Sequence, residues 1–159
     1  MLTEASDPIP FQWLAQDRQL CGAAKFIDVD FEELMISKLE IIRNTPRMKD
    51  LLSINAEVPQ ENGIVFDSEE YVAIGCDLRN PRRLERLLKS VVDLDDCLIL
   101  CLAEVSITYM ASEDSDALIA WTSTLSPGIP VVPPGLPSSS TDKYRCHFLF
   151  IGTAVARST

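Results

Sequence analysis

The sequence predicts an α/β fold with a mainly parallel sheet. Two apolar runs of strand length, Tyr71–Gly75 and Leu98–Ala103, are separated by an amphipathic helical pattern that begins at Pro81. Each run is followed closely by a carboxylate, first Asp77 and then Glu104. Strands that alternate with helices favour a parallel sheet with right-handed crossovers. Because open α/β sheets bind nucleosides beyond the carboxyl ends of their strands, the two acids indicate a binding edge.

The first part of the chain predicts a helix, a strand and a second helix. Proline suits the first turn of a helix, so we expect Pro10 to open a helix that extends through Leu20. Lys25–Val29 is interpreted as a short strand that ends at Asp30. A helical apolar pattern then covers Phe31–Ile42.

Two charged residues of this region have ordinary structural explanations. Asp30 directly precedes the second helix, and Glu33 follows three residues later, which is the spacing of a capping box. We therefore expect Asp30 to cap the helix. Lys38 lies on the apolar face of the same helix, where lysine usually extends its ammonium group to solvent.

The middle of the chain continues the alternation. Ile64–Phe66 is interpreted as a minor strand, and Tyr71–Gly75 as a strand of the sheet. The helix from Pro81 to Val92 carries leucines at the spacing of one buried face. Leu98–Ala103 is apolar throughout, as a central parallel strand should be. A last helix is expected to open at Ser112 or at the acids that follow it.

The pattern changes after Ser126. Residues 127–140 hold five of the ten prolines, so this stretch is interpreted as an extended linker rather than a further helix and strand. For residues 144–155 two alternatives stay open, a strand or a loosely docked segment. The expected division is a partial domain at 1–126 followed by an atypical proline-rich tail at 127–159.

Composition narrows the function classes. With 159 residues and 47% hydrophobic residues, the chain suits one globular domain. A net charge of −10 argues against non-specific binding to nucleic-acid backbones. Five cysteines without a CxxC pair, and a single histidine, make a metal site improbable. The sequence holds no long apolar span, so we expect no membrane insertion and a reducing, cytoplasmic location.

The motifs, taken in order, resemble the leucine carboxyl methyltransferase family. The resemblance is carried by Pro8-Ile-Pro-Phe-Gln-Trp-Leu14, by Phe26-Ile-Asp-Val-Asp-Phe-Glu-Glu-Leu34 with Lys38, by Gly75-Cys-Asp-Leu-Arg79, and by Ala103-Glu-Val-Ser-Ile-Thr-Tyr-Met110 with Ser115. It implies a Rossmann-like, S-adenosylmethionine-dependent methyltransferase core, here incomplete. The first of these motifs and the last resemble the tRNA wybutosine-synthesizing branch as fungal members have it.

The resemblance implies an enzyme that methylates the side-chain carboxylate of a hypermodified guanosine in phenylalanine tRNA. The alternative branch methylates the C-terminal leucine carboxylate of a protein phosphatase catalytic subunit. A third alternative is an inactive remnant without catalysis. The expected partners are therefore tRNA or the phosphatase C-terminus.

The same resemblance assigns the site residues. Asp30 would accept hydrogen bonds from the ribose hydroxyls of S-adenosylmethionine, Asp77 would accept from the adenine amino group, and Leu78 would pack on the adenine ring. Glu104 would lie near the methionine end of the cofactor, and Tyr109 would shape the acceptor pocket. From the residues alone, Asp77 is better explained as a turn residue before Asn80 and Pro81.

The sequence also departs from the family. Members carry a glycine-rich loop just before the position of Asp7 and Pro8, whereas this chain has Met1–Ser6 there, without glycine. The proline-rich tail stands where the family has a further strand. These departures predict an incomplete cofactor pocket. No catalytic acid or base is expected, because a carboxylate acceptor is already ionised near neutral pH.

Overall fold

The computed structural model describes residues 8–17, 24–53, 63–95, 97–103, 110–125 and 145–151. These residues form five helices and five strands: α1 (Ile9–Gln16), β1 (Lys25–Asp30), α2 (Glu32–Asn44), α3 (Pro46–Lys49), β2 (Ile64–Asp67), β3 (Tyr71–Gly75), α4 (Pro81–Val91), β4 (Cys97–Ala103), α5 (Ser112–Thr122) and β5 (Arg145–Ile151). The α/β class predicted from the sequence is confirmed. The first helix ends at Gln16, earlier than expected, because Asp17 leaves the helical conformation with φ −148° and ψ 82°.

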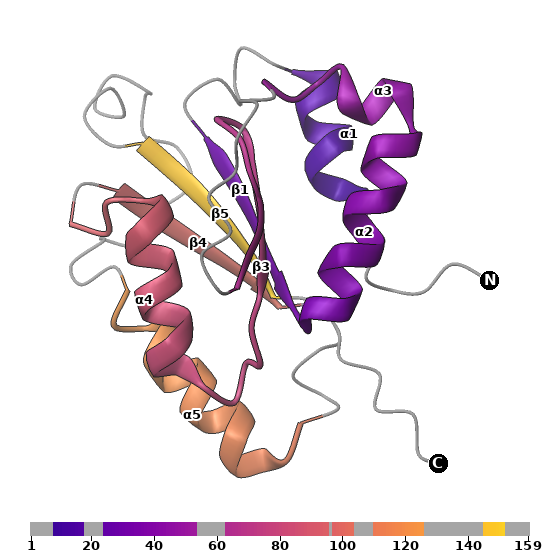
Figure 1. Ribbon diagram of the computed structural model, residues 1–159. Helices are drawn as coiled ribbons and strands as arrows, with labels where there is room; N and C mark the ends of the chain where they lie inside the picture. The colour runs from indigo at the N-terminus through magenta and orange to yellow at the C-terminus, as the bar shows by residue number, and fades with distance from the viewer. Residues whose placement is uncertain are drawn as a thin grey trace.

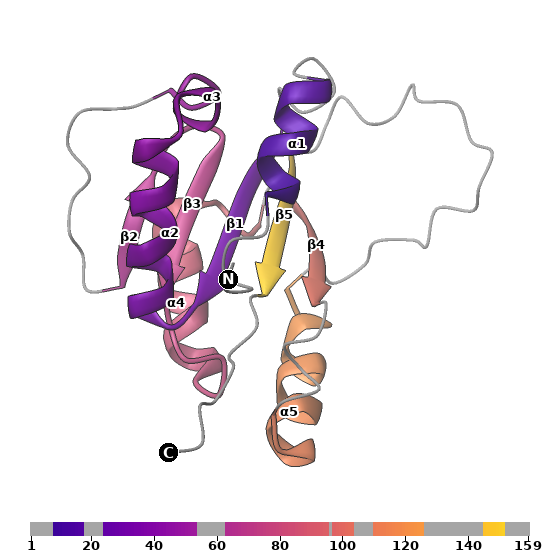
Figure 2. The same cartoon turned by 90° about the vertical axis from the view of Figure 1, so that its right-hand side faces the viewer.

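All five strands belong to one sheet, in the order β2-β3-β1-β5-β4, which can be followed from left to right in Figure 2. Figure 1 shows β3, β1, β5 and β4 of the same sheet from the side. β1 is parallel to β3 and to β5, and β5 is parallel to β4. Only β2, among the described strands, runs antiparallel, alongside β3. The mainly parallel sheet is therefore confirmed, and the minor strand near Ile64 is its antiparallel edge.

The last described strand, β5, lies inside the sheet rather than at its border. Val29 of β1 and Ala103 of β4 are both in register with Ile151 of β5. Of the two alternatives for residues 144–155, the structure thus contains the strand, at 145–151. The proline-rich stretch at 127–140 lies outside the described residues.

Helices cover both faces of the sheet. Figure 2 shows α1 and α2 on one face and α4 on the other. The alternation along β1 explains this arrangement, because successive side chains of a strand point to opposite faces. Phe26 packs in the cluster with α1 and α2, whereas Ile27 and Val29 pack in the cluster with α4. Both faces of β1 are buried, so Asp28 and Asp30, which alternate with its apolar residues, are interior acids.

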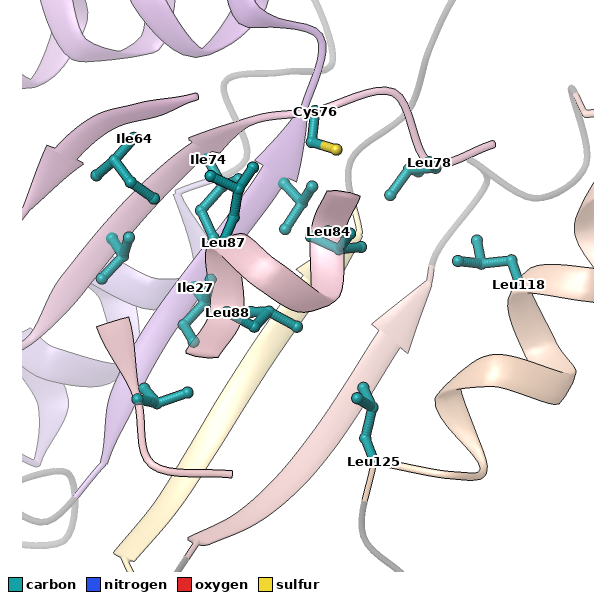
Figure 3. Close-up of a cluster of buried hydrophobic side chains, with 13 residues drawn as sticks. Ile27, Ile64, Ile74, Cys76, Leu78, Leu84, Leu87, Leu88, Leu118 and Leu125 are labelled. Atoms are coloured by element: carbon teal, nitrogen blue, oxygen red, sulfur yellow. The ribbon is translucent and has the colours of Figure 1, made fainter. Parts of the chain in front are cut away.

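The α4 face holds the larger of the two apolar clusters, shown in Figure 3. Leu84, Leu87 and Leu88 of α4 are all buried there, as the helical spacing predicted. The Asn80 side chain accepts a hydrogen bond from the Arg83 amide at 3.1 Å and caps the start of α4. α5 adds Leu118, which is 1% exposed. This packing fixes the turn between β3 and α4 at one edge of the sheet.

Candidate functional site

The carboxyl ends of the parallel strands meet at one edge of the sheet. Register places Asp30 of β1 beside Gly75 of β3, and Ile151 of β5 beside Ala103 of β4. The helix that follows β1 covers one face, and the helices that follow β3 and β4 pack on the other. The helix after β1 therefore lies on the opposite face from the helix after its neighbour β3, and open α/β sheets bind ligands beyond the carboxyl ends of their strands.

Asp30 is the acid that the structure places most firmly at this edge. Its side chain is 1% exposed, and Oδ1 accepts a hydrogen bond from the Phe31 amide at 2.7 Å. Oδ2 is buried and has no hydrogen-bond partner in the described structure. Leaving a buried acceptor without a donor costs free energy. Oδ2 of Asp30 can therefore accept a hydrogen bond from a hydroxyl group of a ligand. The contact with ribose hydroxyls that the family resemblance implies for Asp30 stays a prediction.

The predicted capping role of Asp30 is wrong. α2 begins at Glu32, its cap position is Phe31, and no side chain makes a cap hydrogen bond. Asp30 instead remains the last residue of β1, one residue too early to reach the free amides of the first helical turn. Its carboxylate accepts only from the Phe31 amide. The amides of Leu34 and Met35 donate instead to the Phe31 carbonyl.

Burial governs the ionisation of Asp30. Removal from water, with a smaller contribution from nearby Asp28, raises the pKa of its carboxyl from 3.8 to about 6. The Phe31 amide and the Lys38 ammonium act in the opposite direction. Near neutral pH the carboxyl is mainly ionised, so it carries a charge in a nearly dry position. A ligand that donates hydrogen bonds would relieve this cost.

A buried polar cluster of Asp28, Lys38 and Tyr71 lies beside Asp30, and the sequence analysis did not predict it. The ammonium of Lys38 pairs with Oδ2 of Asp28, and the Tyr71 hydroxyl donates to the same oxygen at 2.6 Å. Lys38 is 4% exposed, so the expectation that it reaches solvent is wrong. The reason is the acceptor on β1: an interior carboxylate holds the ammonium inside. The sequence signal that could have indicated this pair is the presence of opposite charges, Asp28 and Lys38, at inward-facing positions of adjoining elements.

The start of α2 presses closely on the end of β3. A Cβ placed on Gly75 would lie 2.9 Å from Cα of Glu32, so only glycine fits without a shift of the helix. The Cys76 amide donates to the carbonyl of Asp30 at 2.8 Å. These contacts fix the backbone of Asp30 against that of its neighbouring strand.

Asp77 lies two residues beyond the end of β3 and is held by Arg79. Its carboxylate accepts from the guanidinium of Arg79 at 2.6, 2.9 and 3.1 Å and from the Arg79 amide at 2.9 Å. These contacts keep the pKa of Asp77 below its ordinary value. The turn explanation given for Asp77 therefore describes its local geometry. Its side chain remains 37% exposed, so the carboxylate is still accessible to a donor.

Leu78 faces the interior of the protein. It is 6% exposed and belongs to the apolar cluster with Leu84 and Leu118 (Figure 3). Its side chain thus helps to pack α4 and α5 against the turn that carries Asp77. Contact with an adenine ring would need an exposed edge of this side chain, and that role stays a prediction.

The other two expected site residues cannot be placed. Glu104 follows Ala103 directly in the chain, and Tyr109 precedes Met110, but both lie outside the described residues. Their assigned roles stay predictions. The structure therefore brings Asp30 and the Asp77 turn to one edge of the sheet, at the ends of neighbouring strands.

The buried thiol of Cys76 and the half-buried thiol of Cys101 are poorly suited to act as nucleophiles. Burial raises the pKa of Cys76, and it raises the pKa of Cys101 to about 11. A reactive cysteine needs the opposite shift. Within the described part of the chain there is no cluster of three metal-ligating side chains, and no helix is long and apolar enough to cross a bilayer.

Comparison with known proteins gives a consistent set of relatives. The chain is 44% identical over 119 residues to tRNA wybutosine-synthesizing protein 4 of Aspergillus fumigatus, covering 75% of this chain and 11% of that protein. The protein of the same name from Emericella nidulans is 40% identical over 120 residues, covering 76% and 11%. That of Saccharomyces cerevisiae is 31% identical over 127 residues, covering 75% and 18%. No protein-family model matches the chain. The match spans less than a fifth of each of these relatives.

Proposed function

Because the chain belongs, as a partial match, to the family of fungal tRNA wybutosine-synthesizing protein 4, we propose that it forms the nucleoside-binding part of an S-adenosylmethionine-dependent carboxyl methyltransferase acting on tRNA. The substrate is the hypermodified guanosine of phenylalanine tRNA. The observation that carries the proposal is the buried Oδ2 of Asp30, which lacks a partner at the carboxyl edge of the sheet. The fold is proposed to be part of a Rossmann-like methyltransferase core.

Asp30 and Asp77 would divide the recognition of the nucleoside. A carboxylate that accepts from two vicinal hydroxyls suits ribose, and Asp30 has one oxygen available for this. Asp77 is accessible and ionised, with Arg79 fixing its orientation, so it is able to accept from the adenine amino group. Glu104 and Tyr109 are proposed to contact the methionine end of the cofactor and the acceptor.

The chemistry requires alignment rather than proton transfer. When bound, S-adenosylmethionine supplies an electrophilic methyl group on a sulfonium centre. The acceptor carboxylate is already ionised near neutral pH, so the chain needs no general base. Its residues would hold the two reactants in line and exclude water, and such positioning contributes about 7–11 kcal/mol to lowering a barrier. For this reason the proposed site consists of binding residues and includes no catalytic acid or base.

The chain spans only 11–18% of the relatives reported above, so the activity of those whole proteins is a proposal for this chain. Methyl transfer requires the alignment of two reactants, whereas binding involves the cofactor alone. Binding of the nucleoside is therefore the more direct test.

The first experiment measures binding of S-adenosylhomocysteine by calorimetry and by thermal stabilisation. A real ligand raises the stability of the folded protein by mass action. Asp30→Asn should abolish this stabilisation. Asp67→Asn is the matched control, since Asp67 ends the antiparallel strand β2, in register with Val72 near the amino end of β3. Absence of heat and stabilisation at millimolar ligand would favour the inactive remnant.

A second experiment identifies the acceptor. Labelled S-adenosylmethionine is supplied with phenylalanine tRNA that carries the carboxylate precursor, or with a peptide ending in the phosphatase leucine. Incorporation into the tRNA alone supports the proposal. Incorporation into the peptide alone would replace it with the phosphatase branch.

A further inference from the structure

We propose that Asp28, with the Tyr71 hydroxyl, holds Lys38 away from Asp30 and so keeps the second carboxylate oxygen of Asp30 free for the ligand. The inference rests on the proposed function, because it concerns the availability of the same carboxylate. It assigns Asp28 a positioning role, since Asp28 would act through Lys38 and Asp30 without touching the nucleoside.

The geometry places one ammonium near two carboxylates. Asp28 and Asp30 are two residues apart on β1, so their side chains point to the same face of the sheet. α2 packs on that face and carries Lys38, which pairs with Oδ2 of Asp28. Lysine has a flexible four-carbon stem, and strand residues two apart are separated by roughly 7 Å. The same ammonium is therefore able to reach either acid.

Tyr71 decides between the two acids. It is in register with Phe26 on the neighbouring strand, and its hydroxyl donates to the same Asp28 oxygen that Lys38 contacts. The Lys38 ammonium also lies 5.9 Å from the centre of the Tyr71 ring, a cation–π distance. Lys38 thus meets a charged acceptor on Asp28 and an aromatic face on Tyr71. On Asp30, Oδ2 remains without a partner in the described structure.

The charges that act on Asp30 come from two elements: Asp28 belongs to β1, and Lys38 belongs to α2. Since Asp28 and Lys38 carry opposite charges and both are buried, Asp30 faces a nearly neutral pair. Removing only the Asp28 charge would leave Asp30 as the nearest buried anion for Lys38.

The test uses three variants and S-adenosylhomocysteine as the probe. Asp28→Asn keeps an oxygen for the Tyr71 hydroxyl but removes the charge that holds Lys38. We expect Lys38 to pair with Asp30 in this variant, which keeps the buried ammonium partnered and the protein folded. The affinity for S-adenosylhomocysteine should then fall roughly tenfold or more. The double variant Asp28→Asn/Lys38→Met removes the competing cation as well, and binding should recover. Asp28→Glu retains the charge and should bind as the unchanged protein does.

A control and a second readout separate positioning from general damage. Lys25→Met/Asp67→Asn removes another lysine–aspartate pair, which joins β1 to β2 with 2.8 Å between Nζ and Oδ1, and should leave binding unchanged. Without ligand, carbon NMR of Asp30 should show a lower pKa in Asp28→Asn and a value near that of the unchanged protein in the double variant.

The outcomes are distinct. If the unchanged protein does not bind the probe, the proposed function fails and this inference fails with it. If it binds, equal affinity of Asp28→Asn, loss of folding by that variant, or a double variant that binds no better would each overturn the positioning role alone.

Discussion

Replacing Asp30 with asparagine should change how stability depends on pH. Burial raises the pKa of Asp30 from 3.8 to about 6, so the folded protein holds this proton more tightly than the unfolded chain does. The contribution is fully present below pH 3.8 and is lost as the pH rises through about 6. About two pKa units correspond to about 3 kcal/mol of unfolding free energy. Asparagine has no charge to lose across this range.

The assay is urea unfolding of both proteins at intervals between pH 4 and pH 8. An amide in place of the buried carboxylate brings its own cost of about 1–3 kcal/mol, because its N–H groups lack acceptors. That cost does not depend on pH, so the difference between the two curves isolates Asp30. We expect the unchanged protein to lose about 2–3 kcal/mol relative to Asp30→Asn on going from pH 4 to pH 8. Parallel curves would refute the assignment of a raised pKa to burial.

Three further changes test the surroundings of the site. Tyr71→Phe removes a hydrogen bond to the buried Asp28 and should lower the unfolding free energy by about 1–3 kcal/mol in urea, so an unchanged midpoint would contradict the contact. Gly75→Ala forces a Cβ against Glu32 and should cost about 1–3 kcal/mol while weakening nucleoside binding; equal binding would show that α2 yields freely. Asn80→Ala removes the cap of α4 and should cost about 1 kcal/mol by thermal unfolding, whereas Asn80→Asp should restore the cap.

Local signals were sufficient for most of the elements. Tyr71–Gly75 has the bounds expected from its apolar run, and α4 starts at Pro81 after a side-chain cap. In both places propensity, apolar spacing and tertiary burial agree, so the sequence pattern and the packing lead to the same structure. The sequence also indicated the edge of the sheet that carries Asp30, because the strand pattern that begins at Lys25 ended at Asp30.

What the sequence did not predict depends on contacts between distant residues. The partner of Lys38 is on another element, and a single helix pattern cannot distinguish an ammonium that reaches water from one that meets a buried carboxylate. Whether Asp30 caps α2 depends on the residue at which the helix begins, and the structure places that start one residue later than expected. The exact end of a helix is the least certain feature of any sequence pattern. The place of β5 was open because neighbouring strands in a sheet need not be neighbours in the chain.

The interior position of β5 has a consequence for how the protein folds. The ribosome releases the amino-terminal strands first, yet β1 finds its partner on one side only when residues 145–151 have emerged, as the pairing of Lys25 with His147 shows. Until then, β1 and β4 each expose backbone groups along the slot that β5 later fills. Pairing of strands that lie as far apart in the sequence as β1 and β5 is slow. During synthesis the growing chain should therefore depend on chaperones that shield open strand edges, and premature termination before β5 should yield an aggregating product.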